Sequence, residues 1–264
     1  FTKERAQHPI IDHTAFKDLK LLEDNWETIR DEAVALMQQG AIQKSGDESA
    51  KSFYDDGFRT FYKYGWRKFY LTWYGHEHKS ALKHCPKTVA LLRQVKSVNG
   101  AMFSLLPPGS QLTRHLDPVA CSLRYHLGLA TPNNDRCFIN IDGHNYSWRD
   151  GKPLVFDETY LHYALNESEQ SRLILMCDIA RPMNFPGNVI NFFYGLLMKV
   201  TVVPNEEGDK QGLVNKIFST ISPLLRRSKE LKKTNYKAYL VLKWSVNTTL
   251  LVIILALIYG FLKL

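Results

Sequence analysis

Cysteine is scarce in this sequence, and its four copies are scattered. They stand at Cys85, Cys121, Cys137 and Cys177, without a CxxC pair among them. Structural zinc sites and the disulfide frameworks of small secreted domains need cysteines at short or paired spacing. The spacing therefore argues against both kinds of site and favours a reducing compartment.

Acidic residues are fewer than basic ones, and the sequence does not open on a secretory signal. The 264 residues carry 26 Asp and Glu against 34 Lys and Arg, for a net charge of +8. This excess suits nucleic acid, a phosphorylated substrate or an anionic membrane surface, and charge alone does not choose among them. A hydrophobic content of 45% allows a substantial core and argues against disorder. The chain opens on Phe1 without a secretory signal, so a preceding membrane segment stays open.

One long apolar run stands near the end of the chain. Residues 244–262, WSVNTTLLVIILALIYGFL, are uncharged, and a helix of this length spans about 28 Å, close to the hydrocarbon thickness of a bilayer. They predict a C-terminal transmembrane helix, with a buried core helix as the alternative. Basic residues gather upstream and only Lys263 follows, which favours an inner-membrane protein whose large N-terminal part is cytoplasmic.

The rest of the chain changes texture along its length. Residues 16–40 carry apolar positions at helical spacing and end at Gly40, which predicts an amphipathic helix. Residues 99–182 alternate short apolar runs with Pro, Gly and Asn turn signals, which predicts an all-β sandwich or barrel. After Pro182, apolar and basic stretches alternate along the chain. They predict either helices that lie at the membrane interface or ordinary packing helices.

An aromatic run, FYDDGFRTFYKYGWRKFYLTWYG, occupies residues 53–75. Strands whose rings fill the core are the first interpretation, because this is the commoner use of Phe, Tyr and Trp. A groove for an acyl chain or a lipid headgroup is the alternative. Stacking on nucleic acid is disfavoured beside a membrane anchor, so no nucleic-acid partner is expected.

The sharpest chemical signal is LTRHLDPVACSLRYHLGL, residues 112–129. Alternate residues of a strand face the same way, so His115 and Asp117 present an imidazole and a carboxylate together. Such a pair is part of the two-His-one-carboxylate set that suits non-haem Fe(II), and His162 is the candidate for the second imidazole. A lone HxD also occurs as a hydrogen-bonded surface pair, so the motif needs support from elsewhere.

Three basic side chains give that support. Arg172 opens a strand-like run ten residues after His162, and a guanidinium binds a carboxylate through two parallel hydrogen bonds. A solvated strand end is the alternative for Arg172. Arg124 and His126 share strand parity and are placed to face the same cavity, although an interior salt bridge and a satisfied core histidine explain them separately.

Several extended phrases carry a resemblance to a known family. They are SLLPPGSQLTRHLDP, SLRYHLGL, INIDGHNYSWRDGKPLVFDETYLHYALNES and SRLILMCDIARP, together with GWRKFYLTWYG. The chain resembles the aspartyl/asparaginyl β-hydroxylases, which are Fe(II)- and 2-oxoglutarate-dependent dioxygenases. Within that family the membrane-anchored bacterial lipid A 2-hydroxylases are most similar, because a basic helical tail and a terminal apolar run follow the matching region.

The resemblance implies a fold and a set of residue roles. The fold is mainly β with flanking helices, a double-stranded β-helix of the jelly-roll or cupin type, followed by the C-terminal transmembrane helix. The iron ligands match His115, Asp117 and His162. The positions that contact 2-oxoglutarate match Arg172, as anchor of its distal carboxylate, and Ser104, Arg124 and His126. The peptide-hydroxylating branch can carry glycine where this chain has its acidic ligand, which counts against that branch.

These expectations combine into a function and a domain plan. The expected enzyme uses Fe(II), 2-oxoglutarate and O2 to hydroxylate a fatty acyl chain of lipid A at C2, with release of succinate and CO2. Residues 1–185 are expected to form the dioxygenase domain, 186–243 a basic, partly amphipathic membrane-proximal segment, and 244–262 the span. The expected partners are lipid A or a related lipid and the inner-membrane bilayer, with the oligomeric state left open.

Three other functions stay open at this point. A peptidyl aspartyl/asparaginyl β-hydroxylase would use the same scaffold, and another membrane lipid such as ornithine lipid would serve equally as acyl substrate. A tail-anchored binding protein without catalysis is the non-enzymatic alternative, and the presence of Asp117, both histidines and Arg172 argues against it. The acyl chain and the stereochemistry of the product stay open as well.

Overall fold

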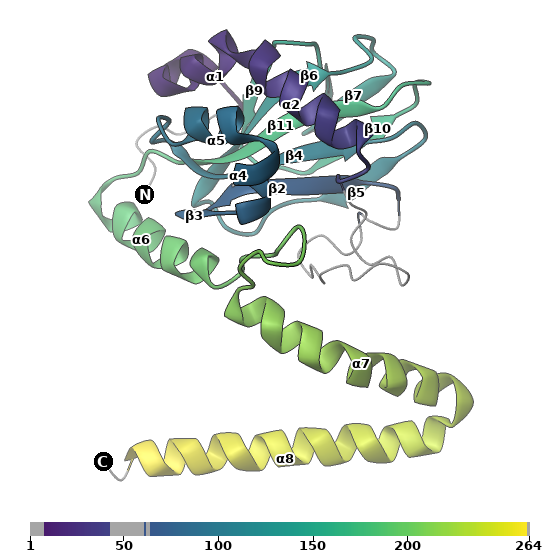
Figure 1. Cartoon of the computed structure of the whole chain (residues 1–264). Coiled ribbons are helices and arrows are strands. Elements are labelled where there is room, and N and C mark those ends of the chain that lie inside the picture. Colours follow the sequence, from purple (N-terminus) through teal and green to yellow (C-terminus); the bar gives the residue numbers. More distant parts are fainter. Residues whose placement is uncertain (1–7, 43–60, 62–63, 263–264) are drawn as a thin grey trace. The chain divides into compact units, whose positions relative to one another are not determined.

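The computed structural model describes residues 8–42, 61 and 64–262, and it divides the chain into an N-terminal unit, Phe1–Lys216, and a C-terminal unit, Ile217–Leu264 (Figure 1). The strands are β1 (Ile10–Ile11), β2 (Arg67–Trp73), β3 (His76–Glu77), β4 (Val98–Leu106), β5 (Gln111–His115), β6 (Ser122–Ala130), β7 (Cys137–Ile141), β8 (His144–Ser147), β9 (Pro153–Phe156), β10 (His162–Asn166) and β11 (Arg172–Ala180). The helices are α1 (Lys20–Asp24), α2 (Trp26–Gln38), α4 (Lys79–His84), α5 (Pro86–Leu92), α6 (Phe185–Lys199), α7 (Leu213–Thr234) and α8 (Tyr236–Leu262), with short 3-10 turns at His13–Ala15 and Lys17–Leu19.

Two antiparallel sheets form the centre of the N-terminal unit. The larger has seven strands in the order β1-β9-β6-β11-β4-β2-β3, and the smaller has four in the order β5-β10-β7-β8. From β4 to β11 the chain passes back and forth between the two sheets, which is the arrangement of a double-stranded β-helix. The expected fold, mainly β with flanking helices, is confirmed for this unit.

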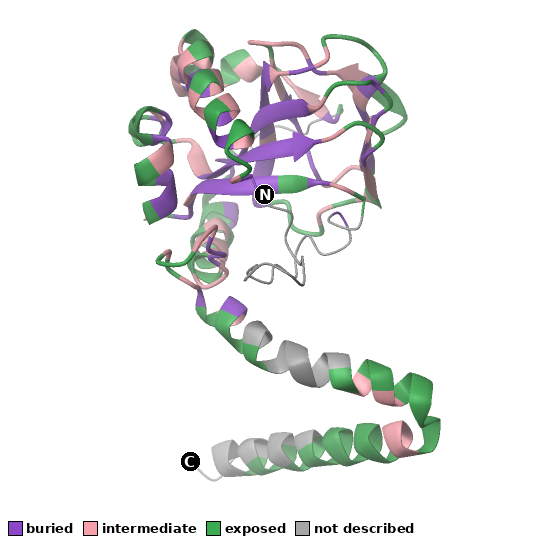
Figure 2. Ribbon diagram, turned by 45° about the vertical axis from the view of Figure 1, so that its right-hand side comes forward, coloured by how far each residue is buried: buried purple, intermediate pink, exposed green. Residues whose placement is uncertain are grey.

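The larger sheet has an apolar core on each face. Its outer face packs against α1, α2, α4 and α5, which lie over the sheet in Figure 1, and its strands are mostly buried in Figure 2. Its inner face meets the smaller sheet across a second cluster that includes Trp66, Phe156 and Ile174. Along β6, Tyr125 points to the helical side, so Arg124 and His126 point between the sheets. This inward face carries the candidate site.

The N-terminal helix expected over residues 16–40 is present but divided. A 3-10 turn leads into α1, and α2 follows after Asn25, whose Nδ2 donates to the carbonyl oxygen of Leu21 at 2.8 Å. The helix ends before Gly40, which adopts a φ of 70°. Only glycine takes this left-handed conformation without strain, so the stop signal works as the sequence indicates.

The aromatic run is a strand in the part that can be described. Residues 53–60 and 62–63 lie outside the described residues, so that part of the prediction is not tested. Phe69 of β2 packs into the helix-side core, whereas Tyr70 of β2 and Trp66, just before the strand, pack between the sheets. Their rings fill the two cores, as the first interpretation holds.

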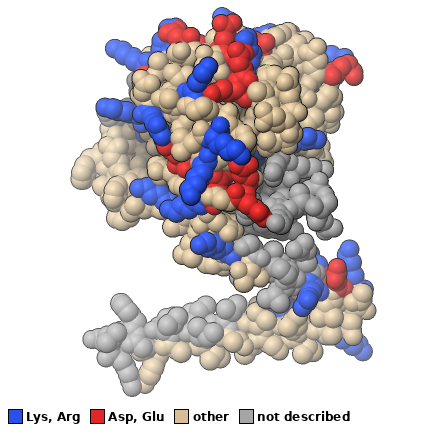
Figure 3. All heavy atoms as spheres, viewed as in Figure 1, with Lys and Arg blue, Asp and Glu red and all other residues tan. Residues whose placement is uncertain are grey.

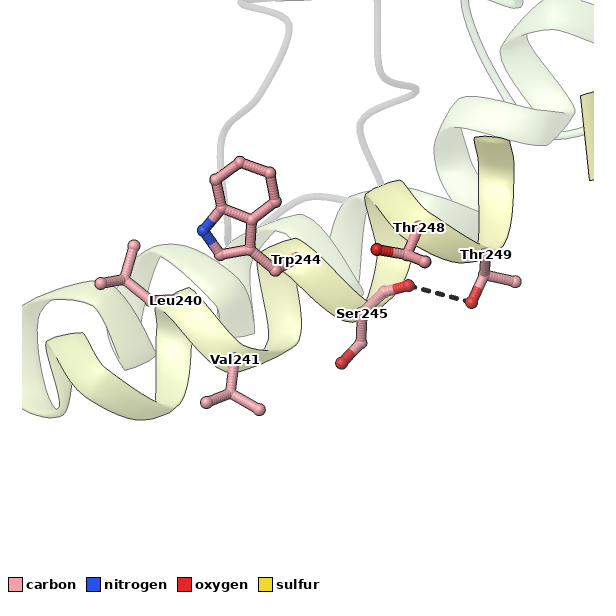
Figure 4. A pocket seen from close by; sticks show the side chains of 6 residues that line it. All are labelled: Leu240, Val241, Trp244, Ser245, Thr248 and Thr249. Carbon is pink, nitrogen blue, oxygen red and sulfur yellow. Dashed lines mark hydrogen bonds between the residues drawn. The ribbon is translucent and has the colours of Figure 1, made fainter. Parts of the chain in front are cut away.

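The C-terminal unit contains the later part of α7 and all of α8. Among the residues that the structure describes, no helix combines the length and the apolarity needed to cross a membrane, so the transmembrane helix expected at 244–262 is not supported. Figure 4 shows a shallow hollow whose six lining side chains all come from α8, where Thr249 Oγ1 donates to the carbonyl oxygen of Ser245 at 2.9 Å.

Gly128 permits a close approach between β6 and the loop before β9. A Cβ at this position would lie 2.0 Å from the carbonyl oxygen of Arg149, and the backbone N–H of Gly151 donates to the carbonyl oxygen of Gly128 at 2.9 Å. Gly128→Ala is expected to destabilise the fold by about 1–3 kcal/mol, because backbone must move to admit the methyl group. Urea denaturation measures this. Gly195→Ala in α6 is the control, since its Cβ would meet Tyr74 at an ordinary 3.9 Å, and equal stability of the two variants would contradict the prediction.

Candidate active site

The two predicted histidine ligands lie opposite each other in the smaller sheet. His115 ends β5, His162 begins β10, and the two residues are directly paired across the antiparallel ladder. Their ring centroids are 4.2 Å apart. Both rings are held the same way, since His115 Nδ1 donates to the carbonyl oxygen of Thr113 at 2.7 Å and His162 Nδ1 donates to that of Tyr160 at 2.8 Å. A proton fixed on Nδ1 leaves the lone pair on Nε2, which is the nitrogen that a metal would take.

Burial keeps both imidazoles neutral. It lowers the pKa of His115, and burial together with the neighbouring His115 lowers the pKa of His162 to about 4. A neutral imidazole is the form that binds a metal ion. At neutral pH the pair is therefore in its ligating state without further proton loss.

Asp117 follows β5 and turns its carboxylate toward Arg124. The Arg124 guanidinium donates to Asp117 Oδ2 at 3.2 Å, and the backbone N–H of Asp117 donates to the carbonyl oxygen of Glu158 at 2.9 Å. Burial raises the pKa of Asp117, but Arg124 and the two imidazoles more than offset this, and the pKa falls below its usual value. The carboxylate is thus ionised at neutral pH and lies near both histidines.

Arg124 is the centre of a buried ionic cluster. Besides Asp117 it pairs with Glu158 and Asp178, both of which lie between the sheets. Burial, opposed by Arg124 and reinforced by the neighbouring Asp178 and Asp117, raises the pKa of Glu158 to about 8. Ser122 Oγ donates to Glu158 Oε1 at 2.6 Å. One guanidinium therefore orients three acids, and the interior salt bridge that was the alternative for Arg124 is what the structure contains.

Arg172 supplies a buried positive charge on the same inner face. Its side chain is 1% exposed, it donates to Ser104 Oγ at 3.3 Å, and its guanidinium carbon lies 4.4 Å from the centroid of the Trp148 ring. Within the described part of the chain its Nε has no hydrogen-bond partner, and the contacts just given include no carboxylate. Burial lowers the pKa of Arg172 to about 10, so it stays charged at neutral pH. A buried charge without an acidic partner is costly, and an anionic ligand would remove that cost.

The side chains around Arg172 are oriented by two indoles. Trp66 Nε1 donates to Ser104 Oγ at 2.7 Å, and Trp148 Nε1 donates to His126 Nδ1 at 3.2 Å. The Nε2 atom of His126 is buried without a hydrogen-bond partner among the described residues, and burial lowers the pKa of this histidine well below its usual value. A neutral His126 with a proton on Nε2 is a donor that still lacks its acceptor.

These groups fit an iron ion and an anionic cosubstrate, with one qualification in the ligand set. Across the described residues, no three His, Cys, Asp or Glu side chains converge closely enough to make a metal site by themselves. The physical reason is Asp117, whose carboxylate is engaged by Arg124 while the imidazoles of His115 and His162 face each other. The structure therefore assembles the two histidines and leaves Asp117 beside them.

Asp157 fixes the turn that leads from β9 to His162. It accepts from Arg181 at 2.7 and 2.5 Å and from Thr159 Oγ1 at 2.7 Å. Burial raises its pKa, but the hydrogen bonds from Arg181 and Thr159 prevail and lower it below the usual value. A carboxyl whose pKa is lowered by folding contributes stability above its unfolded pKa, and that contribution disappears as the pH falls through the folded pKa.

Asp157→Asn is expected to lower the free energy of unfolding by about 3 kcal/mol at neutral pH, because Arg181 would stay buried without its charge partner. The gap between variant and parent should close as the pH falls below about 4. Urea titrations at several pH values measure it. Glu77→Gln, the control, removes the partner of the exposed Arg93 and should cost under about 1 kcal/mol. A gap for Asp157→Asn that is independent of pH would contradict the assignment.

Sequence comparison places this arrangement in a family. A family model described as aspartyl/asparaginyl beta-hydroxylase matches residues 23–182, which is more than half of the chain. The chain belongs to the aspartyl/asparaginyl β-hydroxylase family. The resemblance stated from the sequence phrases is thereby confirmed, and the matched region contains both histidines, Asp117 and Arg172.

The relatives of this chain are named for different substrates. The ornithine lipid ester-linked acyl 2-hydroxylase of Rhizobium tropici is 35% identical over 120 residues, which are 45% of this chain and 43% of that protein. The aspartyl/asparaginyl beta-hydroxylase of Mus musculus is 31% identical over 175 residues, 64% of this chain and 22% of that protein. The chain thus spans less than half the length of either relative. Among solved structures, a Pseudomonas putida prolyl-4-hydroxylase covers 64% of this chain and 98% of its own, with 18% identity and a TM-score of 0.40.

Sequence reasoning missed several residues of the candidate site. Glu158, Asp178 and Trp148 escaped it, although all three contact a residue that it named. Asp178 had a usable signal, since it is a single acid inside the apolar strand RLILMCDIA. A lone charge in a buried strand needs a partner, and Arg124 provides it. Trp148 follows a turn-rich stretch and carries no periodic signal of its own.

Proposed function

We propose that the protein is an Fe(II)- and 2-oxoglutarate-dependent dioxygenase that hydroxylates a fatty acyl chain of lipid A at C2. One observation carries the proposal: His115 and His162 are paired, neutral and share one ring orientation. Arg172 adds a buried positive charge without an acidic partner among the described residues. Membership of a hydroxylase family supports the chemistry. A relative named for acyl 2-hydroxylation of a lipid supports the substrate class.

The residues divide into two groups by role. His115 and His162 would hold the iron through Nε2, with the ionised Asp117 as the third ligand. Bound Fe(II), with 2-oxoglutarate and O2, would supply the oxidising power and release succinate and CO2. Arg124 orients Asp117, and the apolar walls between the sheets exclude water from the reacting carbon.

The second group would hold 2-oxoglutarate. Arg172 would pair with its distal carboxylate, and Ser104 would donate a hydrogen bond to the same group. The Nε2–H of His126 lacks an acceptor among the described residues, and an oxygen of the cosubstrate would accept from it. Trp66 and Trp148 keep these donors in place, because each indole is hydrogen-bonded to one of them.

Exposed apolar side chains beside the ligands favour an acyl substrate over a peptide carboxylate. Leu116 lies between His115 and Asp117 in the sequence and is 52% exposed, and Leu161 precedes His162 and is 47% exposed. Val119 is exposed in the same loop as Leu116. An apolar rim of this kind suits a hydrocarbon chain that enters between the sheets.

The proposal also places the enzyme at the cytoplasmic face of the inner membrane. Support comes from exposed basic residues of the C-terminal unit, such as Arg227, Lys229 and Lys233, because anionic headgroups attract such clusters. As an arrangement of the chain we propose a dioxygenase domain over residues 1–185, a basic membrane-proximal segment over 186–243 and a terminal apolar segment over 244–262.

Expression in a Gram-negative host whose lipid A lacks 2-hydroxyacyl groups tests the reaction and the substrate together. Mass spectrometry should find lipid A heavier by one oxygen, located at C2 of an acyl chain after fragmentation. The same extract should be searched for hydroxylated ornithine lipid and for hydroxylated Asp or Asn in peptides. One added oxygen on a peptide and none on any lipid would replace the lipid proposal by peptidyl β-hydroxylation.

A further inference from the structure

Helix α6 presents an apolar surface where a soluble protein would normally present a polar one. Its exposed large hydrophobic residues are Phe185, Val189, Ile190, Phe192, Phe193, Leu196 and Leu197. The helix contains a single charged residue, Lys199 near its end. In Figure 3 the surface over α6, at the lower left of the N-terminal unit, is mostly free of charged side chains. Contiguous exposed apolar patches of this kind mark interaction surfaces.

The opposite side of α6 is firmly attached to the N-terminal unit. Tyr194 packs edge-on against Tyr74, with ring centroids 5.9 Å apart, and Asn191 Nδ2 donates to the carbonyl oxygen of Arg181 at 3.3 Å. Gly187, one turn before Asn191, is buried. Gly187, Asn191 and Tyr194 are spaced three to four residues apart and therefore lie on one side of the helix. The exposed apolar residues lie on the other side.

The attached side connects α6 to the candidate active site. The backbone N–H of Arg181 donates to the carbonyl oxygen of Cys121 at 3.4 Å, and Cys121 ends the loop that carries Leu116 and Val119. Burial raises the pKa of both the Tyr74 and the Tyr194 phenol, and the charge of the nearby Asp178 adds to the shift. Asp178 in turn pairs with Arg124. The apolar helix and the apolar rim of the site are thus linked by short chains of contacts.

We infer that the outer face of α6 inserts into the interfacial layer of an anionic lipid bilayer and thereby holds the apolar rim of the active site against the membrane. This deepens the proposed function, and its activity test rests on that function. Fifteen residues give α6 a length of about 22 Å, too short to cross a bilayer core of about 30 Å but suited to lying along its surface.

Charge favours a bilayer over another protein as the occupant. No acidic residue occurs in α6 or the residues up to Asn205. The acids Glu206, Glu207 and Asp209 follow in the loop before α7, where Asp209 accepts from Ser80. The later part of α7 exposes Arg227, Lys229 and Lys232, which attract anionic headgroups. Phenylalanine and leucine on one face with lysine near the end match an interfacial helix. A lipid substrate would then meet the rim without leaving the membrane.

The test places an environment-sensitive fluorophore on the full chain in lipid vesicles. All four native cysteines are buried, so a cysteine introduced at Phe193 labels selectively. Leu82→Cys on α4 is the matched control, because Leu82 is also an exposed apolar residue of the N-terminal unit. In phosphatidylethanolamine–phosphatidylglycerol vesicles, nitroxide-labelled phospholipids should quench the probe at position 193 strongly and the probe at 82 little. Leu197→Cys provides a second position on the same face and should behave like Phe193→Cys.

Two results would overturn the inference. One is equal quenching by the labelled lipids at positions 193 and 82. The other is a probe at 193 that is shielded from aqueous iodide but not quenched by lipid, which would show that protein covers α6. If that shielding depends on protein concentration, the cover is a second copy of the chain, and if it does not, the cover is the chain's own C-terminal unit.

Turnover separates this inference from the proposed function. The double variant Phe192→Glu, Phe193→Glu should hydroxylate vesicle-embedded lipid at least about tenfold more slowly, while its rate on the same lipid in detergent micelles stays within about twofold of the parent. Leu82→Glu should change neither rate. Equal loss in vesicles and micelles would refute a membrane role for α6, whereas lipid quenching at 193 without any lipid hydroxylation would refute the proposed function and leave the docking surface standing.

Discussion

Replacing His162 with alanine is expected to lower hydroxylation by at least about a thousandfold, because the iron would lose one of its two imidazole ligands. The residue is buried, its Nδ1 is bound by the Tyr160 carbonyl, and its ring faces that of His115 at 4.2 Å between centroids. No other described imidazole is paired with His115 in this way. His115→Ala should therefore have an effect of the same size. The measurement is succinate formation with Fe(II), 2-oxoglutarate and a lipid substrate.

His144→Ala is the matched control for both variants. His144 lies in the same smaller sheet, is exposed, and also places its Nδ1 on a backbone carbonyl, that of Asp142 at 3.2 Å. It should retain the activity of the parent. Activity of folded His162→Ala within about tenfold of the parent would mean that this imidazole is not an iron ligand.

Arg172→Gln is expected to raise the KM for 2-oxoglutarate about thirtyfold or more, since removing one partner of a buried charge pair costs about 2–5 kcal/mol. The guanidinium is 1% exposed and has an unpartnered Nε, so the cosubstrate carboxylate would be its counterion. Glutamine keeps much of the size and some of the hydrogen bonding but not the charge. Steady-state rates over a wide range of 2-oxoglutarate concentrations measure the change.

Arg93→Gln is the control for charge removal alone. Arg93 is exposed and pairs with Glu77, far from the two sheets' interior face. Its KM for 2-oxoglutarate should equal that of the parent. If Arg172→Gln lowered kcat and left KM unchanged, the guanidinium would have a role in stability or substrate placement and not in holding the cosubstrate.

Much of the fold could be predicted because its signals are local. The turn residues between short apolar runs in 99–182 mark most of the strands from β4 to β11, and Gly40 marks the end of the first helix. The pairing of those strands into two sheets is not local, and it came from the family resemblance. Asn25 divides the first helix through a hydrogen bond to Leu21, an effect that periodicity does not register.

The site shows where residue patterns stop being informative. Strand parity correctly places Arg124 and His126 on one face, but parity cannot say what each contacts across that space. Arg124 binds three acids from three different segments, whereas His126 faces Trp148. Asp117 stays a predicted iron ligand, and its pairing with Arg124, seven residues further along the chain, was not predicted because strand parity does not describe the loop between them.

At the C-terminal segment the sequence predicted a feature that the structure does not support. Composition alone predicted a membrane span at 244–262, yet within the described residues no helix qualifies as one. The more informative apolar surface is on α6, where exposure depends on how the helix packs through Tyr194 and Asn191.

The most direct test of the central claim is the visible absorption of the Fe(II)–2-oxoglutarate chelate, measured without oxygen on the full chain. If His115 and His162 hold Fe(II) and the protein binds 2-oxoglutarate to the same ion, a new band should appear and saturate at about one Fe(II) per chain. The band should be lost in folded His162→Ala and kept in His144→Ala. A parent chain that is folded but develops no band, or a His162→Ala variant with the full band, would contradict the account.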